Sequence, residues 1–396
     1  MSSSGARSVF VVTGNRAEYD IQYPVLEALR ARGDVRLRIV VTGAHLSPFH
    51  GETVREIEAD GFTELIRIPT LLAADTPAAR ALGLASQIDA FARLFEREHP
   101  DIVLACGDRE EVLAAAVACI YLNVIFAHYA AGDEAFDGNV DNAVRHAASK
   151  LAHLMLVTHP RHRDLLLASG ERGARVHVVG DSGLDRIRSE PVLSEAELES
   201  LLPFSLPPRP RALMIHHSMT TTIETAHEEV RNIFVALKRA NINGVVSYPN
   251  TDAGNVSIRR VVDEECRSDG YLAYSNLARS AFVNLARSCD FLIGNSSMGI
   301  LEAPLLSLPA INVGQRQRLR LRGDNVVFCT SGVDAIAEAI RRVQVPAFRA
   351  GLSGQSPYGD GRSGERIASI VAETELSSRL RFKTFEALRA AFVAEP

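Results

Sequence analysis

The sequence lacks the features that mark several common classes of protein. Positive charge is not in surplus, because 43 Lys and Arg stand against 48 Asp and Glu, for a formal net charge of -5; this argues against a dedicated nucleic-acid binder. No apolar run approaches the roughly 18–20 residues of a membrane-spanning helix. The first residues are polar and lead directly into an apolar run, without the apolar core and cleavage site of an export signal. We therefore expect a cytoplasmic protein that binds neither nucleic acid nor membrane.

Cysteine and lysine are also scarce. The five cysteines are scattered, without the closely spaced Cys and His of a zinc site, so we expect reduced thiols and no metal. The only lysines are Lys150, Lys238 and Lys383, whereas arginine is abundant. We interpret this mainly as composition bias, although the planar guanidinium also suits bidentate binding of phosphate.

Short, continuous apolar runs alternate with helical segments in both halves of the chain. In the first half these runs span residues 8–13, 35–42, 101–106, 124–128 and 176–180; in the second they span 212–215, 244–248, 291–293, 310–313 and 326–329. Such runs are typical of parallel strands covered by helices on both faces. The pattern predicts an α/β protein with two Rossmann-like domains that face a cleft.

A proline-rich stretch divides the two halves. Prolines between residues 186 and 210 flank an acidic helical segment, 194–201, and predict the interdomain linker. We expect an N-terminal α/β domain over residues 1–186 and a C-terminal α/β domain over 211–370. The amphipathic tail, 371–396, is expected to pack back on the N-terminal domain as a helix.

Polar residues follow the predicted strands, at the edge where open α/β sheets bind ligands. The first strand is followed by Gly14–Tyr19, which carries Arg16 and suits a diphosphate, but lacks the glycine pattern of a dinucleotide site. Asp108 and Arg109 follow the 101–106 run. Asp108 is either a general acid or base, or the N-cap of the Ala-rich helix behind it.

A polar loop follows the next strand. Residues 128–141 carry four carboxylates and lead into a helix that holds Arg145 and His146. Such a density of acids in one turn region predicts a functional site.

The second half carries an anion-binding pattern. Residues 294–299 contain glycine and serine before a predicted helix that includes Glu302, and residues 314–323 form an arginine-rich loop. Backbone N–H groups at such a helix start can cradle an anion. The alternative is that the serines only cap the helix.

Taken in order, these motifs resemble the UDP-N-acetylglucosamine 2-epimerase family, and most closely its hydrolysing branch in sialic-acid biosynthesis, which releases free N-acetylmannosamine. The resemblance runs from Val9 to Arg366. Its most specific segments are Arg16–Tyr19, Val41–Leu46, Gly107–Arg109, Val140–His146, Tyr248–Gly254, Gly294–Ser297 and Gly323–Val326.

The resemblance implies a fold like that of GT-B glycosyltransferases, a UDP-sugar substrate, no cofactor and a homodimer. It places acid/base chemistry in the N-terminal domain and UDP in the C-terminal domain. The implied catalytic residues are Asp108, Asp141 and His216, the last near the phosphates, with Asp133 and Glu134 as further carboxylates. The implied UDP-binding residues are Arg16, Arg109, Asn250, Ser296, Ser297, Glu302 and Arg316, with Phe282 at the base. His45, Arg145 and His146 are additional candidates.

The family reaction removes the C2 proton and expels UDP to give a 2-acetamidoglucal, which is then re-protonated at C2 from the other face. The chain departs from the family in the catalytic loop. Ala130 stands where family members usually have a glutamate, the loop after it is longer, and Asn142 replaces the second acid of an Asp-Asp pair. Asp133 or Glu134 could supply the missing carboxylate, or a proton-transfer step, the substrate or the product has changed.

Three other functions remain open. They are epimerisation of another nucleotide-linked amino sugar, such as a 4-amino-4,6-dideoxy or GDP-linked one; glycosyl transfer on the same architecture; and non-catalytic binding of a UDP-sugar. Whether the product is N-acetylmannosamine or UDP-N-acetylmannosamine is equally open.

Overall fold

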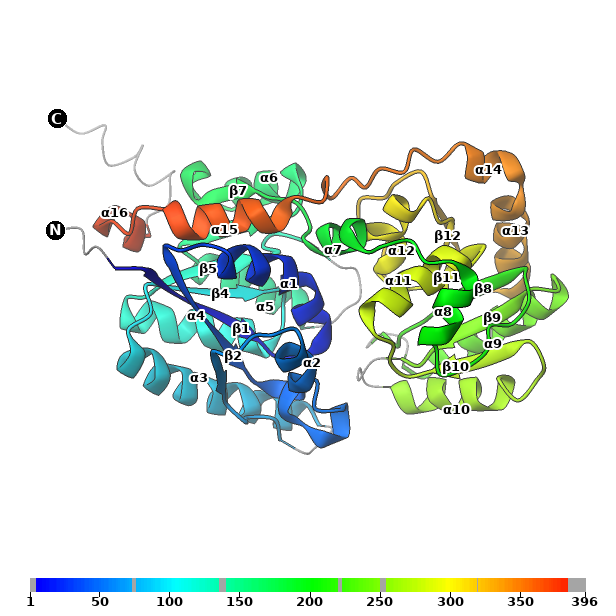
Figure 1. The fold of residues 1–396 in the computed structure, drawn as a ribbon, viewed down its shortest axis with the longest axis horizontal. Coiled ribbons are helices and arrows are strands. Elements are labelled where there is room, and N and C mark those ends of the chain that lie inside the picture. Colours follow the sequence, from blue (N-terminus) through cyan, green and yellow to red (C-terminus); the bar gives the residue numbers. More distant parts are fainter. Residues whose placement is uncertain are drawn as a thin grey trace. The chain divides into compact units, whose positions relative to one another are not determined.

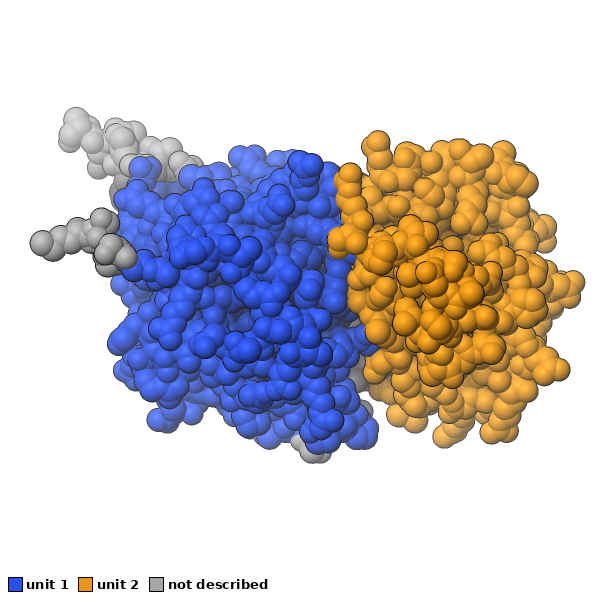
Figure 2. All heavy atoms as spheres, viewed as in Figure 1, with its two compact units in different colours: residues 1–133, 140–186, 358–396 blue, residues 134–139, 187–357 orange. Residues whose placement is uncertain are grey.

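The computed structural model describes residues 5–72, 76–134, 140–219, 223–249, 254–318 and 320–383. These residues form two compact units, coloured separately in Figure 2. The first unit holds the described residues up to Asp133, Val140–Arg186, and those from Tyr358 onward. The second holds Ile187–Pro357 together with Glu134.

The first unit is built on a seven-stranded parallel sheet, in the order β3-β2-β1-β4-β5-β6-β7 (Figure 1). Its strands are β1 (Arg7–Thr13), β2 (Val35–Val41), β3 (Leu65–Arg67), β4 (Ile102–Cys106), β5 (Ile125–Tyr129), β6 (Leu154–Val157) and β7 (Val176–Val178). Alternate residues of β1 enter different cores: Val9 and Val11 pack on one face of the sheet, Phe10 and Val12 on the other. The continuous apolar runs therefore reflect burial on both faces.

Helices cover both faces of this sheet. One core includes side chains of α1 (Arg16–Arg30), α2 (Val54–Ala59) and α15 (Ser363–Glu373). The other includes side chains of α3 (Pro77–Glu98), α4 (Glu110–Leu122), α5 (Asp141–Leu151) and α6 (Pro160–Ala168). The remaining helices are α7 (Gly183–Ser189), α16 (Ser378–Arg381), η1 (Gly43–Leu46), η2 (Pro48–His50) and η3 (Gly173–Arg175).

The C-terminal segment returns to the first sheet. Helix α15 lies along α1 (Figure 1), and the two meet at Gly364, where a Cβ would lie 2.7 Å from the Pro24 carbonyl carbon. Only glycine allows this approach of the two helices. Residues 384–396, half of the tail predicted as a helix, lie outside the described residues.

The second unit repeats the architecture with six parallel strands, in the order β10-β9-β8-β11-β12-β13. The strands are β8 (Arg211–Ile215), β9 (Asn243–Ser247), β10 (Tyr271–Tyr274), β11 (Phe291–Gly294), β12 (Ala310–Val313) and β13 (Val326–Cys329). The helices are α8 (Glu195–Leu201), α9 (Ala226–Arg239), α10 (Asn255–Glu265), α11 (Arg279–Ser288), α12 (Met298–Leu301), η5 (Ala303–Leu306), α13 (Val333–Gln344) and α14 (Pro346–Ala350). The predicted fold class, two Rossmann-like α/β domains, is confirmed.

The sequence analysis did not predict three of the strands, β3, β6 and β10. Both β3 and β10 lie at an edge of their sheet, where a strand pairs on one side only and carries fewer fully buried side chains. Strand β6 is fully buried but only four residues long, so its apolar run is too short to distinguish from a buried helix segment.

Candidate active site

The turn after β1 is fixed by its own polar side chains. Asn15 caps α1 by accepting a hydrogen bond from the Glu18 N–H at 3.1 Å, and the Glu18 carboxylate accepts one from the Gly14 N–H at 2.9 Å. Arg16, in the first turn of α1, forms a 3.1 Å ion pair with Glu56 of α2. The predicted phosphate arginine is thus held on a rigid turn at the carboxyl end of β1.

Asp108 is not the cap of the helix that follows β4. Helix α4 begins at Glu110, its N-cap is Arg109, and no side chain completes that cap. Asp108 instead forms an ion pair with Arg145 of α5, whose side chain is 4 % exposed, against 26 % for Asp108. Of the two interpretations of Asp108, the capping one is therefore wrong, and the carboxylate is available to a chemical role.

Arg145 contacts three segments of the predicted catalytic region. Besides Asp108, its guanidinium donates to the Asp133 carbonyl at 2.9 Å and to the Asn142 side-chain oxygen at 3.4 Å. Since the Arg145 side chain is nearly buried and its guanidinium is planar, these contacts hold its position closely. The carboxyl end of β4, the loop after β5 and the start of α5 are therefore joined at one cation. Sequence reasoning had ranked Arg145 only as an additional candidate.

Asp133 is the buried carboxylate of the loop after β5. Its Oδ1 lies 3.3 Å from His162 Nε2, and the other ring nitrogen of His162 lies 3.0 Å from the Thr158 hydroxyl. Gly132 has a φ of +71°, and a Cβ there would lie 2.8 Å from the His162 carbonyl. Glycine thus lets the loop approach α6 closely enough for this pairing.

For the other predicted residues of this region, the structure gives the position and burial of the side chain. Glu134 is half-buried, and Asp141 and His146 are half-buried on α5, with Asp141 as its first residue. Residues 135–139 lie outside the described residues. Ala130, where the family glutamate was expected, has a left-handed backbone with a φ of +59°.

Two buried histidines fix the framework of the first unit. His128 lies 2.8 Å from the Gly107 carbonyl and 3.0 Å from the Ser149 hydroxyl, and burial lowers its pKa to about 4. The predicted candidate His45 lies between the hydroxyls of Thr13 and Thr53 at 3.0 and 2.7 Å, and burial lowers its pKa to about 4 as well. In both of these neutral histidines, each ring nitrogen forms a hydrogen bond with a protein group.

In the second unit, the backbones at the ends of β8 and β11 lie in close contact. Gly294 has a φ of +137°, and a Cβ there would lie 2.0 Å from the Ile215 carbonyl oxygen. The Asn295 side chain accepts from the His217 N–H at 2.7 Å and donates to its carbonyl at 2.8 Å. His216, the first residue after β8, is buried, and its Nε2 lies 3.0 Å from the Glu229 carboxylate of α9.

The predicted UDP residues lie around the same strand ends. Ser296 accepts from the Met298 N–H at 3.3 Å, whereas Ser297 is the N-cap of α12 without a side-chain bond. Arg316 donates to the Asn295 carbonyl at 3.4 Å, and Glu302 forms a 3.1 Å ion pair with Arg279.

The helix expected to contain Glu302 is shorter than predicted. Helix α12 ends at Leu301, and the chain continues as the 3₁₀ turn η5, which begins at Ala303 and has Pro304 as its second residue. Because a single turn aligns few peptide dipoles, the predicted positive helix end contributes little here. Phe282 packs against the core beneath α11, and Asn250 lies outside the described residues.

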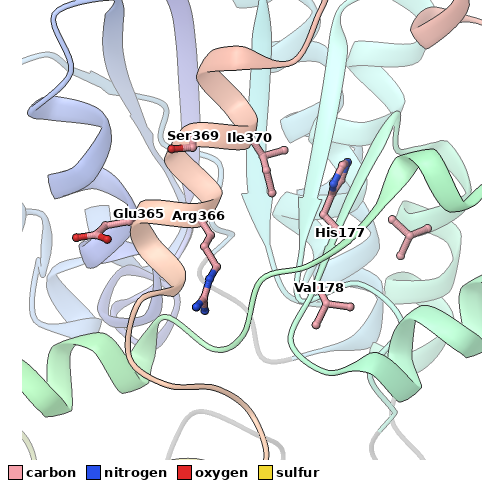
Figure 3. A pocket seen from close by; sticks show the side chains of 7 residues that line it. His177, Val178, Glu365, Arg366, Ser369 and Ile370 are labelled. Carbon is pink, nitrogen blue, oxygen red and sulfur yellow. The ribbon is translucent and has the colours of Figure 1, made fainter.

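A shallow groove elsewhere in the first unit contains none of these residues. It lies between the edge strand β7 and α15, and its lining includes His177, Val178, Glu365 and Arg366 (Figure 3). The groove is thus separate from the carboxyl-end clusters described above.

Comparison with known proteins identifies the family. The family model for UDP-N-acetylglucosamine 2-epimerase matches residues 27–372. The chain belongs to this family. It is 33 % identical to the UDP-N,N'-diacetylbacillosamine 2-epimerase (hydrolyzing) of Legionella pneumophila over 94 % of this chain and 98 % of that one. It is 30 % identical to the GDP/UDP-N,N'-diacetylbacillosamine 2-epimerase (hydrolyzing) of Campylobacter jejuni, over 87 % of this chain and 89 % of that one.

Solved structures agree with the fold. The crystal structure of UDP-GlcNAc 2-epimerase from Neisseria meningitidis bound to UDP-GlcNAc superposes with a TM-score of 0.78 at 18 % identity, over 92 % of this chain and 100 % of that one. The predictions of the family, of its GT-B-like fold and of an epimerase are therefore confirmed. Within the described residues, none of the helices has both the length and the apolar character needed to cross a membrane.

Proposed function

We propose that this 2-epimerase acts on a UDP-linked 2-acetamido sugar and releases UDP as it inverts C2. Support for hydrolysis comes from the Legionella pneumophila relative, which is named as a hydrolysing enzyme and 98 % of whose length is covered by this chain. The observation that carries the chemistry is the Asp108–Arg145–Asp133 cluster at the carboxyl ends of β4 and β5. It brings the Asp108 carboxylate and the backbone of Asp133, whose own carboxyl group is buried against His162, to one guanidinium.

The reaction divides between these groups as follows. One carboxylate takes the C2 proton while the C1–O bond breaks, and the bonding electrons leave with UDP. Water then adds at C1 of the resulting 2-acetamidoglucal as a proton is delivered to the opposite face of C2. Because the two proton transfers occur on opposite faces, two separately positioned acid/base groups are required. Asp108 and Asp133 are assigned to them, with Asp141 as a further candidate.

Asp133 is the better candidate than Glu134 to replace the family glutamate missing at Ala130. Its carboxylate is buried against His162, and its own carbonyl is bound by Arg145. A proton-transfer group must be held rigidly in reach of the proton it moves. These contacts hold Asp133 in the same cluster as Asp108.

UDP is assigned to the strand ends of the second unit. There Ser296, Ser297 and Arg316 surround the segment after β11, and Glu302 is available to the ribose hydroxyls. An arginine and backbone N–H groups suit a diphosphate. Arg16 and Arg109 stay predicted phosphate-binding residues of the first unit, and Phe282 and Asn250 stay predicted residues of the uridine side.

Two sugars are candidates for the rest of the substrate. N-acetylglucosamine follows from the family description and its motifs. N,N'-diacetylbacillosamine, which carries an additional acetamido group, is favoured by the names of the relatives at 33 % and 30 % identity. Both share the 2-acetamido group and the UDP leaving group on which the proposed chemistry depends.

Incubation in deuterated water with each UDP-sugar, followed by proton and phosphorus NMR, tests the proposal. We expect UDP, a free manno-configured sugar and deuterium at C2. A UDP-linked product would show that the nucleotide is retained and would contradict hydrolysis. Binding of both UDP-sugars without turnover would contradict epimerisation and favour a binding protein, whereas transfer of the sugar to an added acceptor would favour a glycosyltransferase.

The homodimer implied by the family resemblance stays a prediction. Light scattering on the purified full chain tests it, with a mass of twice 43.0 kDa expected.

A further inference from the structure

The ring of His216 is anchored through one nitrogen only. The side chain is 1 % exposed, and its Nε2 lies 3.0 Å from Glu229 Oε2. Its Nδ1 is also buried but has no hydrogen-bond partner among the described residues. Since a buried polar atom without a partner costs stability, such atoms in native structures usually have a functional reason.

The Glu229 carboxylate indicates which ring nitrogen of His216 carries the proton. Asn295 is oriented by its two hydrogen bonds to the His217 backbone, and this orientation leaves its NH2 group 3.3 Å from His216 Nε2. One hydrogen of that NH2 group is donated to the His217 carbonyl at 2.8 Å, so the amide does not fix the tautomer; the shorter contact of Nε2 is with Glu229, at 3.0 Å. The Glu229 carboxylate is an acceptor, so the Nε2 proton of His216 is donated to it. In the neutral ring, Nδ1 then carries the free lone pair.

We infer that Glu229 is a positioning residue for the proposed hydrolysis: it holds the proton on Nε2 of His216, so that Nδ1 is the atom offered to the diphosphate. This rests on the proposed function. When Nδ1 takes a second proton from solvent, the imidazolium binds between two anions, the Glu229 carboxylate and a phosphate oxygen of UDP. It thereby neutralises the charge that grows on UDP as the C1–O bond breaks.

The backbone places this pair where the chemistry needs it. Glu229 lies in the first turn of α9, and its Oε1 lies 3.8 Å from the Cβ position at Gly314, which follows β12. The ends of β8, β11 and β12 therefore converge on it. Among the described residues, the charged or titratable groups near the pair include Arg316 and His217; burial first, and then Arg316 and His216, lower the pKa of His217 well below its usual value. His217 is accordingly neutral.

Nitrogen-15 NMR of the full chain, labelled at histidine, tests the tautomer directly. The signal of His216 is assigned with a His216→Asn variant. We expect the Nε2–H tautomer in the free protein and protons on both nitrogens after UDP is added. An Nδ1–H tautomer in the free protein would overturn the inference, whether or not the Glu229 variants fold.

Activity variants test the consequence. Glu229→Gln, whose amide no longer dictates the ring proton, should lower kcat/KM by about 10- to 100-fold, as expected for loss of a hydrogen bond to a charged group, and should weaken the Nε2–H signal. Glu229→Asp should recover part of the activity. Glu228→Gln, at the exposed neighbouring position on α9, is the matched control and should behave as wild type.

The outcomes separate this inference from the proposed function. If the wild type turns over neither UDP-GlcNAc nor UDP-N,N'-diacetylbacillosamine, the proposed function fails, while the spectra and calorimetry with UDP still decide the role of Glu229. If Glu229→Gln keeps the kcat/KM and UDP affinity of Glu228→Gln, or loses activity with an unchanged His216 tautomer, the inference is wrong.

Discussion

The carboxyl groups of Glu18 and Glu111 are buried on either side of Gly14, beneath the turn that carries Arg16. Glu18 Oε2 accepts the Gly14 N–H at 2.9 Å, and a Cβ on Gly14 would lie 2.4 Å from the Glu111 carboxyl carbon. Burial, and secondarily the charge of Glu111, raise the pKa of Glu18 to about 8. Burial also raises the pKa of Glu111. Sequence reasoning missed this pair because its members are 93 residues apart.

Glu18 should make the protein less stable as the pH rises. Its carboxyl group has a pKa of about 8 in the folded protein, against an ordinary value of 4.5, so the folded state holds an extra proton between these values. The free energy of unfolding therefore falls as the pH rises through this window, by at most about 1.4 kcal/mol per pH unit. Glu18→Gln should remove this slope. Urea unfolding between pH 5 and 8 measures it, with Glu96→Gln, at an exposed position of α3, as the control.

His128 should make the protein less stable as the pH falls, in a lower pH range than that of Glu18. Its pKa is lowered to about 4 from 6.5, so the unfolded state binds the proton first as the pH falls. Stability contributed by the neutral ring is present above pH 6.5 and is lost between pH 6.5 and 4, again by at most about 1.4 kcal/mol per unit. His128→Asn should flatten this limb of the unfolding curve. An unchanged acid limb in the variant would contradict the assignment to His128.

Asp108 and Arg145 should act as one catalytic unit. Asp108→Asn keeps the size of the side chain but removes the base, so turnover should fall by at least about 100-fold while UDP affinity is retained. Arg145→Met removes the cation that holds Asp108 and should also lower kcat. Steady-state kinetics and calorimetry with UDP measure both effects, and Arg93→Met, on an exposed surface, is the control. An active Asp108→Asn enzyme would remove Asp108 from the mechanism.

Substitution of Asp133 should lower kcat far more than substitution of Glu134, although the two residues are neighbours in the chain. Asp133→Asn should lower kcat by about 100-fold or more, because it removes the proposed second proton-transfer group. Glu134→Gln should change kcat much less, because the carboxylate that faces His162 and the carbonyl that Arg145 binds both belong to Asp133. Comparable losses in both variants, or a loss only in Glu134→Gln, would reverse the assignment.

Much of the fold was accessible from the sequence because burial leaves a local signature. A strand covered on both faces must be apolar throughout, so runs such as 101–106 and 310–313 identified the two sheets. Glycines and polar residues directly after these runs identified the edge that carries the site. The short edge strands β3 and β10 carry a weaker signature and were missed.

The contacts within the site could not be predicted from local sequence patterns. The sequence left Asp108 open between a helix cap and a chemical role, and it ranked Asp133 and Glu134 equally. Helix α4 starts one residue later than the cap would require, and Asp108 reaches Arg145, 37 residues away. Glu229 and His162 did not stand out, because nothing in their immediate neighbours indicates a partner.

The sequence alone therefore determined the class of protein: its α/β halves, its family and the strand ends where its polar residues gather. These follow from apolar periodicity and from motifs of a few consecutive residues. The tertiary structure decided which of those residues act together, namely Asp108 with Arg145, Asp133 with His162, and His216 with Glu229. Such pairings depend on which strand ends and helix faces meet after folding, and no short stretch of sequence contains that information.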